Sequence, residues 1–173
     1  NNNIAKKYPE TFDPSISAEL VYSGSRDLTE KLDNVSLDVG KLVLSPTRTY
    51  APVISEILKA HRKQIHGMVH CSGGGQTKVL HFIDNLHIVK NDLFETPPLF
   101  ELIQSESSTS WSEMYKVFNM GHRMEIYIDP AFAKDIISIC SSFNLEAKII
   151  GFVESSSKKQ LTISSNKGDF KYE

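Results

Sequence analysis

The sequence contains few cysteines and no long hydrophobic run. Neither of its two cysteines, Cys71 and Cys140, belongs to a CxxC pair, so the chain has neither a disulfide framework nor a zinc-site pattern. No apolar segment approaches the roughly 20 residues of a membrane-spanning helix, and the first residues do not resemble a signal peptide. We therefore expect a cytoplasmic protein with two free thiols and no membrane partner.

An excess of basic residues is also missing. The 19 lysines and arginines are outnumbered by 21 aspartates and glutamates, and the formal net charge is −2. A surface that binds nucleic acid through its phosphates needs a basic excess, so we expect no nucleic-acid partner. Hydrophobic residues make up 40% of the chain, which is typical of a globular protein with a core.

The sequence has no initiator methionine, since it begins with asparagine. We interpret it as a fragment of a longer protein. Residues 1–41 are polar and interrupted by prolines, so we expect an N-terminal arm there, with a helical turn at residues 28–32 capped by Asp27. Residues 42–173 are expected to form one C-terminal domain that ends in a hairpin.

A run of three glycines separates a short apolar strand from a segment with helical character. The strand is predicted at residues 68–70, the glycines are residues 73–75, and the helical segment is residues 76–83. Glycine permits positive φ and close approach of a ligand, and the start of a helix offers unpaired N–H donors to an anion. The spacing matches neither the Walker loop nor GxGxxG, so the residues alone leave an anion site and a simple tight turn equally open.

Two further side chains are candidates for ligand contacts. Arg48 lies just ahead of a helix that Ala51-Pro52 opens, and its guanidinium could hold a phosphate or carboxylate in a bidentate pair. The alternative is a surface arginine paired with a local acid such as Glu56. His70 ends the strand before the glycines, where side chains face a ligand crevice, and a histidine satisfied in the core is an equal alternative.

The hydrophobic pattern predicts an α+β fold with a mixed, largely antiparallel sheet packed with helices. Helices are also expected after Ser110, which has the spacing of a capping box with Glu113, and after Asp129-Pro130, where Cys140 belongs to the core face. The other expected elements are a helix at residues 99–104, strands at residues 86–90, 124–128 and 147–153, and a closing hairpin of residues 161–163 and 170–172. The strands at 124–128 and 147–153 would form one strand–helix–strand unit.

Three stretches together resemble the phosphoribosylformylglycinamidine cyclo-ligase family, also called aminoimidazole ribonucleotide synthetase, of purine biosynthesis. They occur in the family's order and with compatible spacing, and the resemblance covers roughly residues 42–154. The stretches are Leu44-Ser45-Pro46-Thr47-Arg48-Thr49-Tyr50, Gly67-Met68-Val69-His70-Cys71-Ser72-Gly73-Gly74-Gly75 and Glu113-Met114-Tyr115-Lys116-Val117-Phe118-Asn119-Met120-Gly121.

The resemblance implies the C-terminal domain of an enzyme that uses ATP and Mg²⁺. Such an enzyme phosphorylates the formyl oxygen of formylglycinamidine ribonucleotide, and a nitrogen of the same molecule closes the imidazole ring to give aminoimidazole ribonucleotide. The family's N-terminal half carries most of the ATP site and the dimer interface, and nothing in this chain resembles it. The resemblance therefore implies a homodimer in the full-length form and an inactive isolated fragment, with residues 1–41 as the remnant of the domain junction.

The resemblance also implies which residues contact the substrate or its phosphate, while it assigns neither a catalytic residue nor a metal ligand. These residues are Gly73, Gly74, Gly75, Arg48, His70, Thr47 and Asn119.

The segment after the glycines departs from the family, which usually places an aromatic residue there, followed by Glu-Asn and Pro-Arg. This chain has Gln76-Thr77-Lys78-Val79 instead, and Lys78 or Arg123 could replace a missing basic contact. Two alternatives stay open. One is a related ATP-using enzyme of the formylglycinamidine ribonucleotide synthetase, thiamine-monophosphate kinase or selenophosphate synthetase type. The other is a non-catalytic binding module on the same fold.

Overall fold

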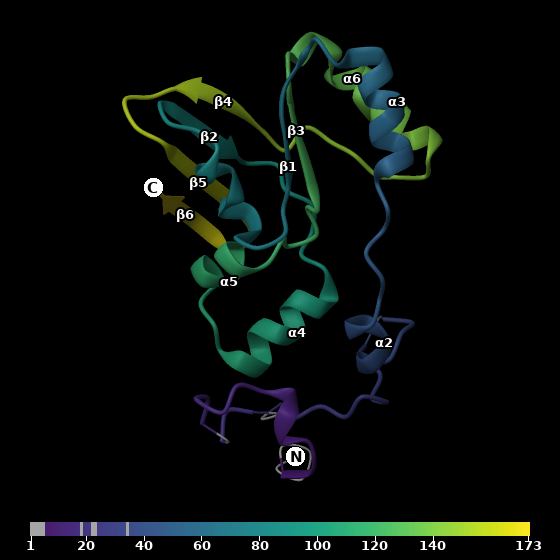
Figure 1. Cartoon of the computed structure of the whole chain (residues 1–173), viewed down its shortest axis with the longest axis vertical. Coiled ribbons are helices and arrows are strands. Elements are labelled where there is room, and N and C mark those ends of the chain that lie inside the picture. The colour runs from purple at the N-terminus through teal and green to yellow at the C-terminus, as the bar shows by residue number, and fades with distance from the viewer. Residues whose placement is uncertain (1–5, 18, 22–23, 34) are drawn as a thin grey trace.

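The computed structural model describes residues 6–17, 19–21, 24–33 and 35–173. An N-terminal arm lies at one end of an elongated molecule, and helices and two sheets form the remainder (Figure 1). In chain order the elements are η1 (Pro9–Thr11), α2 (Val39–Val43), α3 (Ala51–His61), β1 (Ile65–His70), η2 (Gly75–His81), β2 (Leu86–Lys90), α4 (Pro98–Ser107), α5 (Trp111–Val117), β3 (Met124–Ile128), η3 (Pro130–Phe132), α6 (Ala133–Ser142), β4 (Gly151–Ser155), β5 (Gln160–Ser165) and β6 (Gly168–Tyr172).

The strands form two sheets with no backbone ladder between them in the described residues. β1 and β3 make an antiparallel ribbon, and the other four strands form a sheet in the order β4-β2-β5-β6. β2 runs parallel to β5, and the remaining pairs are antiparallel. The expected α+β fold with a mixed, largely antiparallel sheet is therefore confirmed, as is the closing hairpin, which β5 and β6 form.

The expected strand–helix–strand unit is wrong, because β3 and β4 belong to different sheets. The expected strand at residues 147–153 also begins too early, since β4 starts at Gly151. A Cβ atom at Gly151 would lie only 1.8 Å from the carbonyl oxygen of Val89. The ladder with β2 begins at this glycine, and the carbonyl of Ile150 accepts bonds from the amides of Asn91 and Asp92, which follow β2.

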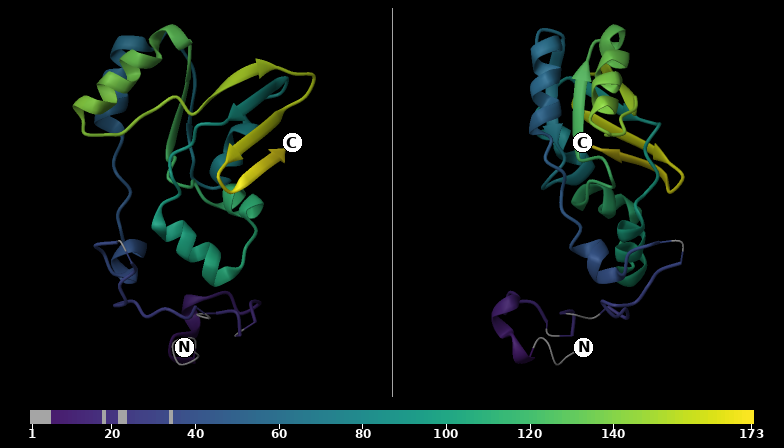
Figure 2. Two further views of the ribbon diagram at one scale, coloured as in Figure 1. Left: turned by 180° about the vertical axis from the view of Figure 1, so that it is seen from behind. Right: turned by 90° about the vertical axis from the view of Figure 1, so that its right-hand side faces the viewer.

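The main core lies between the four-stranded sheet, η2 and α5. Leu161 and Ile163 of β5 are fully buried there, together with Met114 and Tyr115 of α5. A second, smaller core lies where α3 and α6 cover the outer face of the β1–β3 ribbon, and Ile57 is its most buried residue. The ribbon therefore lies between the helix pair and the main core (Figure 2).

Alternation along β3 separates these two cores. Ile126 and Ile128 pack with the α3–α6 helix pair, whereas Glu125 and Tyr127 point to the opposite face, toward the main core. A charged residue on the inward face of a strand needs a buried partner, and this requirement shapes the site described below.

The predicted helix boundaries are largely confirmed. Ser110 Oγ accepts a hydrogen bond from the amide of Glu113 at 3.3 Å and caps α5. Asp129 likewise caps η3, which leads directly into α6. Asn144 follows α6 with φ +53, a left-handed conformation that asparagine tolerates better than most residues.

The predicted helical turn at residues 28–32 is wrong. Lys31 forms a β-bridge with Asp38, and Leu28 accepts a bond from the amide of Gly40, so this segment pairs with the chain that follows it. Asp38 caps a helix instead, α2. The arm also contacts α4, where Glu106 accepts bonds from the amide and hydroxyl of Ser25. None of the helices in the described ranges is both long and apolar enough to span a membrane.

Candidate functional site at the glycine loop

The glycine loop, residues 71–75, connects β1 to η2 as a tight, hydrogen-bonded turn. The amide of Gly75 donates to the carbonyl of Ser72 at 2.9 Å. The amide and hydroxyl of Thr77 both donate to the carbonyl of Gly74, each at 2.9 Å. The helical segment predicted after the glycines is confirmed, in the tighter 3₁₀ form.

The three glycines have different physical roles. Gly75 has φ +49, and an added Cβ would lie 2.4 Å from the carbonyl oxygen of Phe118 and 2.8 Å from that of Tyr115. Gly74 has φ +92, with the nearest atom 3.5 Å from an added Cβ. Gly73 is exposed, and nothing lies within 4 Å of an added Cβ. The absence of a side chain at Gly75 thus allows the end of α5 to pack closely against the loop. Gly74 permits the left-handed turn, and Gly73 alone offers open backbone to a ligand.

Lys78 places a positive charge beside this loop. Its Nζ donates to Ser72 Oγ at 3.4 Å, and its Cα is the atom nearest to a Cβ added at Gly74, at 3.5 Å. Arg48 instead donates from a guanidinium nitrogen to the carbonyl of Asn144 at 2.8 Å, just beyond α6. Its suggested partner, Glu56, pairs with Lys59 at 2.6 Å.

The remaining candidate residues are not gathered at one point. Thr47 is exposed in the extended segment between α2 and α3, and His70 is exposed at the end of β1. Asn119 Oδ1 accepts from the amide of Gly121 at 2.9 Å, and its carbonyl accepts from Gln76 Nε2 at 2.6 Å. Asn119 therefore supports the loop from behind. Within the described ranges, no hydrogen bond or ion pair joins Thr47 or Arg48 to the glycine loop.

Behind the loop lies a buried polar cluster that sequence reasoning missed. Lys90, 1% exposed, donates to the carbonyl oxygen of Gln76 at 2.8 Å, to its side-chain oxygen at 3.0 Å, and to Glu125 Oε1 at 2.5 Å. Tyr127 donates its hydroxyl proton to Glu125 Oε2 at 2.6 Å. The sequence did contain a signal for this cluster, because Glu125 and Tyr127 share one face of a predicted strand and Lys90 is the last residue of another predicted strand.

His122 is held neutral at the edge of this cluster. Its Nδ1–H donates to the carbonyl of Met120 at 3.2 Å, because a carbonyl can only accept. Its Nε2 then accepts from the amide of Phe94 at 3.0 Å. Burial, the largest cause, lowers the pKa of His122 to about 4, so this imidazole is an uncharged structural group at neutral pH.

Cys71 is the second titratable group whose pKa burial shifts strongly. Burial, with a smaller contribution from the charge of Glu125, raises the pKa of the Cys71 thiol to about 12. A reactive cysteine needs a lowered pKa, so Cys71 is a core residue. Both cysteines are free thiols, as predicted.

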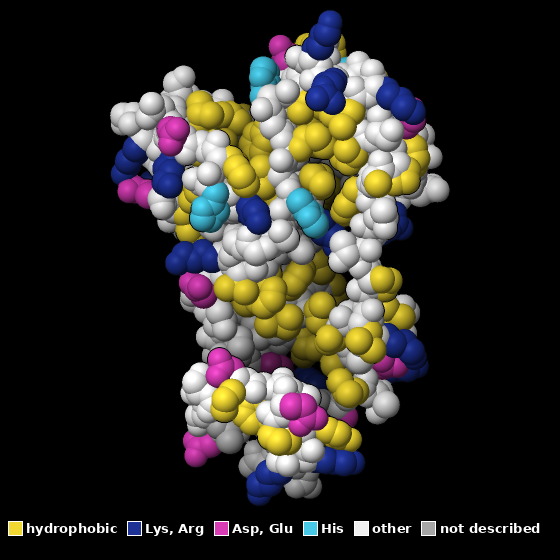
Figure 3. All heavy atoms as spheres, viewed as in Figure 1, with side chains coloured by type: hydrophobic (Ala, Val, Ile, Leu, Met, Phe, Trp, Pro, Cys, Tyr) yellow, Lys and Arg dark blue, Asp and Glu magenta, His cyan; other side chains and the backbone are white. Residues whose placement is uncertain are grey.

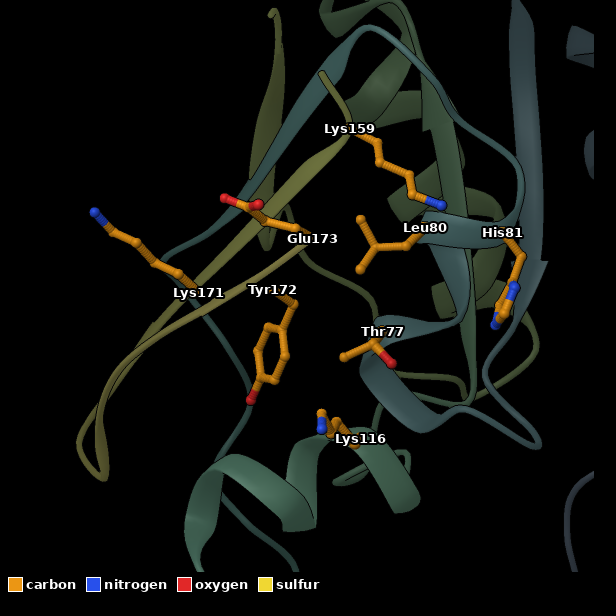
Figure 4. Close-up of a pocket in the computed structure, with 8 residues that line it drawn as sticks. All are labelled: Thr77, Leu80, His81, Lys116, Lys159, Lys171, Tyr172 and Glu173. Atoms are coloured by element: carbon orange, nitrogen blue, oxygen red, sulfur yellow. The ribbon is translucent and has the colours of Figure 1, made fainter. Parts of the chain in front are cut away.

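A cavity of about 410 Å³ lies against η2, where α5 and β6 approach it (Figure 4). In Figure 4, Lys159 extends over Leu80 toward His81, whereas Lys171 points away from the other residues. Tyr172 forms part of the wall of the cavity and donates its hydroxyl proton to the carbonyl of Ser112 at 2.9 Å. The lining residues are Thr77, Leu80, His81, Lys116, Lys159, Lys171, Tyr172 and Glu173.

Comparison with known proteins identifies a family. The family model described as AIR synthase related protein, C-terminal domain, matches residues 17–164. Three proteins named phosphoribosylformylglycinamidine cyclo-ligase are similar to the chain. The one from Methanopyrus kandleri is 34% identical over 116 residues, which are 67% of this chain and 33% of the relative. The one from Methanocaldococcus jannaschii is 32% identical over 142 residues, which are 79% of this chain and 39% of the relative. The one from Alkaliphilus metalliredigens is 29% identical over 163 residues, and the match covers 83% of this chain and 46% of the relative.

The chain thus spans between a third and a half of the length of these relatives. Among solved structures it is similar to E. coli HypE, a hydrogenase maturation protein, with a TM-score of 0.50 and 14% identity. That match covers 78% of this chain and 43% of HypE. At such low identity the likeness shows a shared fold only.

Proposed function

Because the chain belongs to the AIR synthase related protein C-terminal domain family, we propose that it is the C-terminal domain of an ATP-dependent cyclo-ligase. The reaction closes the imidazole ring of formylglycinamidine ribonucleotide and gives aminoimidazole ribonucleotide, a step of purine biosynthesis. The observation that carries this proposal is the similarity, at about 30% identity over most of the chain, to proteins named for that activity.

The glycine loop is the proposed contact for the phosphate of the ribonucleotide. Gly73 supplies backbone that a phosphate can approach, Gly74 gives the loop its left-handed turn, and Lys78 supplies the charge that an anion requires. Gly75 and Asn119 hold the loop in place through α5 and Gln76. This assignment replaces Arg48 with Lys78 as the principal cation, since Arg48 already bonds to the carbonyl of Asn144, just beyond α6.

Thr47, Arg48 and His70 are proposed as outer contacts that reach the substrate from exposed positions. Thr47 and Arg48 belong to the extended segment ahead of α3, and His70 ends β1 directly before the loop. Each side chain is exposed, so a substrate bound between this domain and a second domain could meet them.

ATP and Mg²⁺ are proposed to bind mainly to a second, N-terminal domain. The described residues contain no group of three or more His, Cys, Asp or Glu side chains that could hold a metal ion, so no metal ligand is assigned to this chain and no step is derived through the metal. The greater length of the relatives supports a further domain, with residues 1–41 as the junction. A homodimer formed through that domain and a cytoplasmic location complete the proposal.

Exposed hydrophobic side chains support a covering domain. Leu44 is 81% exposed and Val43 is 58% exposed, both beside the proposed junction. Hydrophobic side chains also gather across the middle of the face seen in Figure 3. Contiguous apolar surface of this kind marks an interaction site on a protein.

Reconstitution tests the proposed activity. The chain alone is expected to give no ring closure with ATP, Mg²⁺ and formylglycinamidine ribonucleotide. Joined to the N-terminal half of a cyclo-ligase such as the Methanocaldococcus jannaschii relative, it is expected to support turnover. Turnover by the chain alone, or none in a folded fusion that binds ATP, would count against the assignment.

The phosphate site has its own test in the reconstituted enzyme. Lys78→Ala should raise the Michaelis constant for the ribonucleotide about 10- to 100-fold, because a charge-assisted hydrogen bond contributes roughly 1.5–3 kcal/mol. Lys63→Ala, in the exposed connection between α3 and β1, is the matched control and should change nothing. Equal kinetics in the two variants would leave the loop as a tight turn without a ligand.

A further inference from the structure

Lys90 lies behind the glycine loop and bonds to the residue that directly follows Gly75. We propose that Lys90 is a positioning residue, which fixes the conformation of the glycine loop through Gln76. Neither residue is exposed enough to meet a ligand, since Lys90 is 1% exposed and Gln76 is fully buried. Their effect on ligand binding is therefore indirect.

Lys90 holds Gln76 at two points. The ammonium group donates both to its backbone carbonyl and to its side-chain oxygen. With its oxygen occupied in this way, the side-chain amide of Gln76 directs its Nε2 toward the carbonyls of Asn119, at 2.6 Å, and His122, at 3.4 Å. Gln76 thus links the start of η2 to the turn after α5 while Lys90 sets its orientation.

Glu125 allows the ammonium group to remain charged in the core. A buried charge is costly unless it is paired and hydrogen-bonded. The three N–H groups of the Lys90 ammonium donate to Gln76 and Glu125. The second oxygen of Glu125 accepts from Tyr127. No buried side-chain nitrogen or oxygen in the described residues lacks a hydrogen-bond partner, so the network is complete.

The network also joins the two sheets. Lys90 ends β2 of the four-stranded sheet and Glu125 belongs to β3 of the ribbon, and the described residues have no backbone ladder between these sheets. The glycine loop starts from the ribbon, and η2 packs on the four-stranded sheet. A connection at this point therefore sets where the loop lies between its two supports.

Hydrogen exchange separates positioning from a general contribution to stability. In K90M/E125L both charges are removed, so no unpaired ion stays buried, but the oxygens of Gln76 lose their donor. The amides of Gly75 and Thr77, which close the loop, are expected to exchange at least tenfold faster than in the unaltered chain. The amides of Leu161 and Ile163 in β5 should keep their rates. Equal acceleration at all four amides, or no acceleration in the loop, would overturn the proposal.

Two more variants complete the test. K148M removes an exposed ion pair with Asp92 and should leave loop exchange unchanged. Q76M keeps the Lys90–Glu125 pair, so it remains informative if the double variant does not fold, and it should accelerate the amides of Gly75 and Thr77 while those of Leu161 and Ile163 keep their rates. An unchanged Thr77 amide in Q76M would contradict a role for Gln76.

The consequence for ligand binding rests on the function proposed above. In the reconstituted enzyme, K90M/E125L should raise the Michaelis constant for the ribonucleotide more than tenfold, whereas the turnover number changes less. Faster loop exchange with an unchanged Michaelis constant would support the positioning role and count against the phosphate site.

Discussion

Alanine in place of Gly75 should destabilise the protein far more than the same substitution at Gly73. At Gly75 the new Cβ would meet the carbonyl oxygens of Phe118 and Tyr115 at 2.4 and 2.8 Å, and φ is +49. At Gly73 the new Cβ would meet nothing within 4 Å. The two positions therefore separate close internal packing from open space within one loop.

The size of the effect follows from two terms. A left-handed conformation costs an alanine roughly 1 kcal/mol relative to glycine. Overpacking against backbone atoms that cannot rotate away costs about 1–3 kcal/mol more. Gly75→Ala should thus lower the free energy of unfolding by about 2–4 kcal/mol, which corresponds to roughly 5–15 °C in Tm for a chain of this size.

Urea denaturation followed by tryptophan fluorescence measures this difference directly. The single tryptophan, Trp111, begins α5, the helix whose end Gly75 contacts. Gly73→Ala should stay within about 0.5 kcal/mol of the unaltered protein, as exposed substitutions usually do. If Gly75→Ala were as stable as Gly73→Ala, the tight contact between the loop and α5 would be refuted.

Three further outcomes are expected. The pKa of His122 is lowered to about 4 in the folded protein, below its usual value near 6.5, so the unfolded chain takes up the proton first. The contribution of neutral His122 to the free energy of unfolding should be fully present above about pH 6.5 and should fall by about 3 kcal/mol between pH 6.5 and 4. In urea titrations at several pH values His122→Gln should flatten this dependence, and an unaltered pH dependence in the variant would contradict the prediction. A thiol reagent should leave native Cys71, which is 2% exposed, unmodified, whereas denaturation without reductant should release two thiols; a single thiol would be incompatible with two free cysteines. Ser110→Ala should lower the free energy of unfolding by about 1 kcal/mol through loss of the cap on α5, and a change of less than 0.3 kcal/mol, on the order of measurement error, would show that the cap is unimportant.

Local signals in the sequence predicted most of the elements. Ser110 and Asp129 cap the helices they were expected to cap, because a cap involves residues only two or three positions apart. The closing hairpin and the strand that became β2 follow from alternating hydrophobicity and turn residues. The strand expected at residues 147–153 was placed too early because its pairing with β2 begins only at Gly151, where Val89 lies close, and no local pattern reveals this contact.

The sequence predicted where the candidate site lies but not which contacts hold the glycine loop in place. The order of strand, glycines and helix located the loop, and the family resemblance was confirmed. The sequence could not distinguish Gly73, which is open, from Gly75, which contacts Tyr115 and Phe118 at the end of α5, 40 and 43 residues further along the chain. It also could not show that Arg48 bonds beyond α6 while Lys78 lies beside the loop.

By itself, the sequence determined the fold class, the family and the position of the glycine loop, because these depend on periodicity and on short motifs. The tertiary structure decided which sheet each strand joins and which groups stand behind the loop. Lys90 and Glu125 are 35 positions apart and meet at 2.5 Å only because β2 and β3 are brought together by the main core. Contacts of this kind arise from packing between distant segments, and the energetic need to pair a buried charge appears only once burial itself is known.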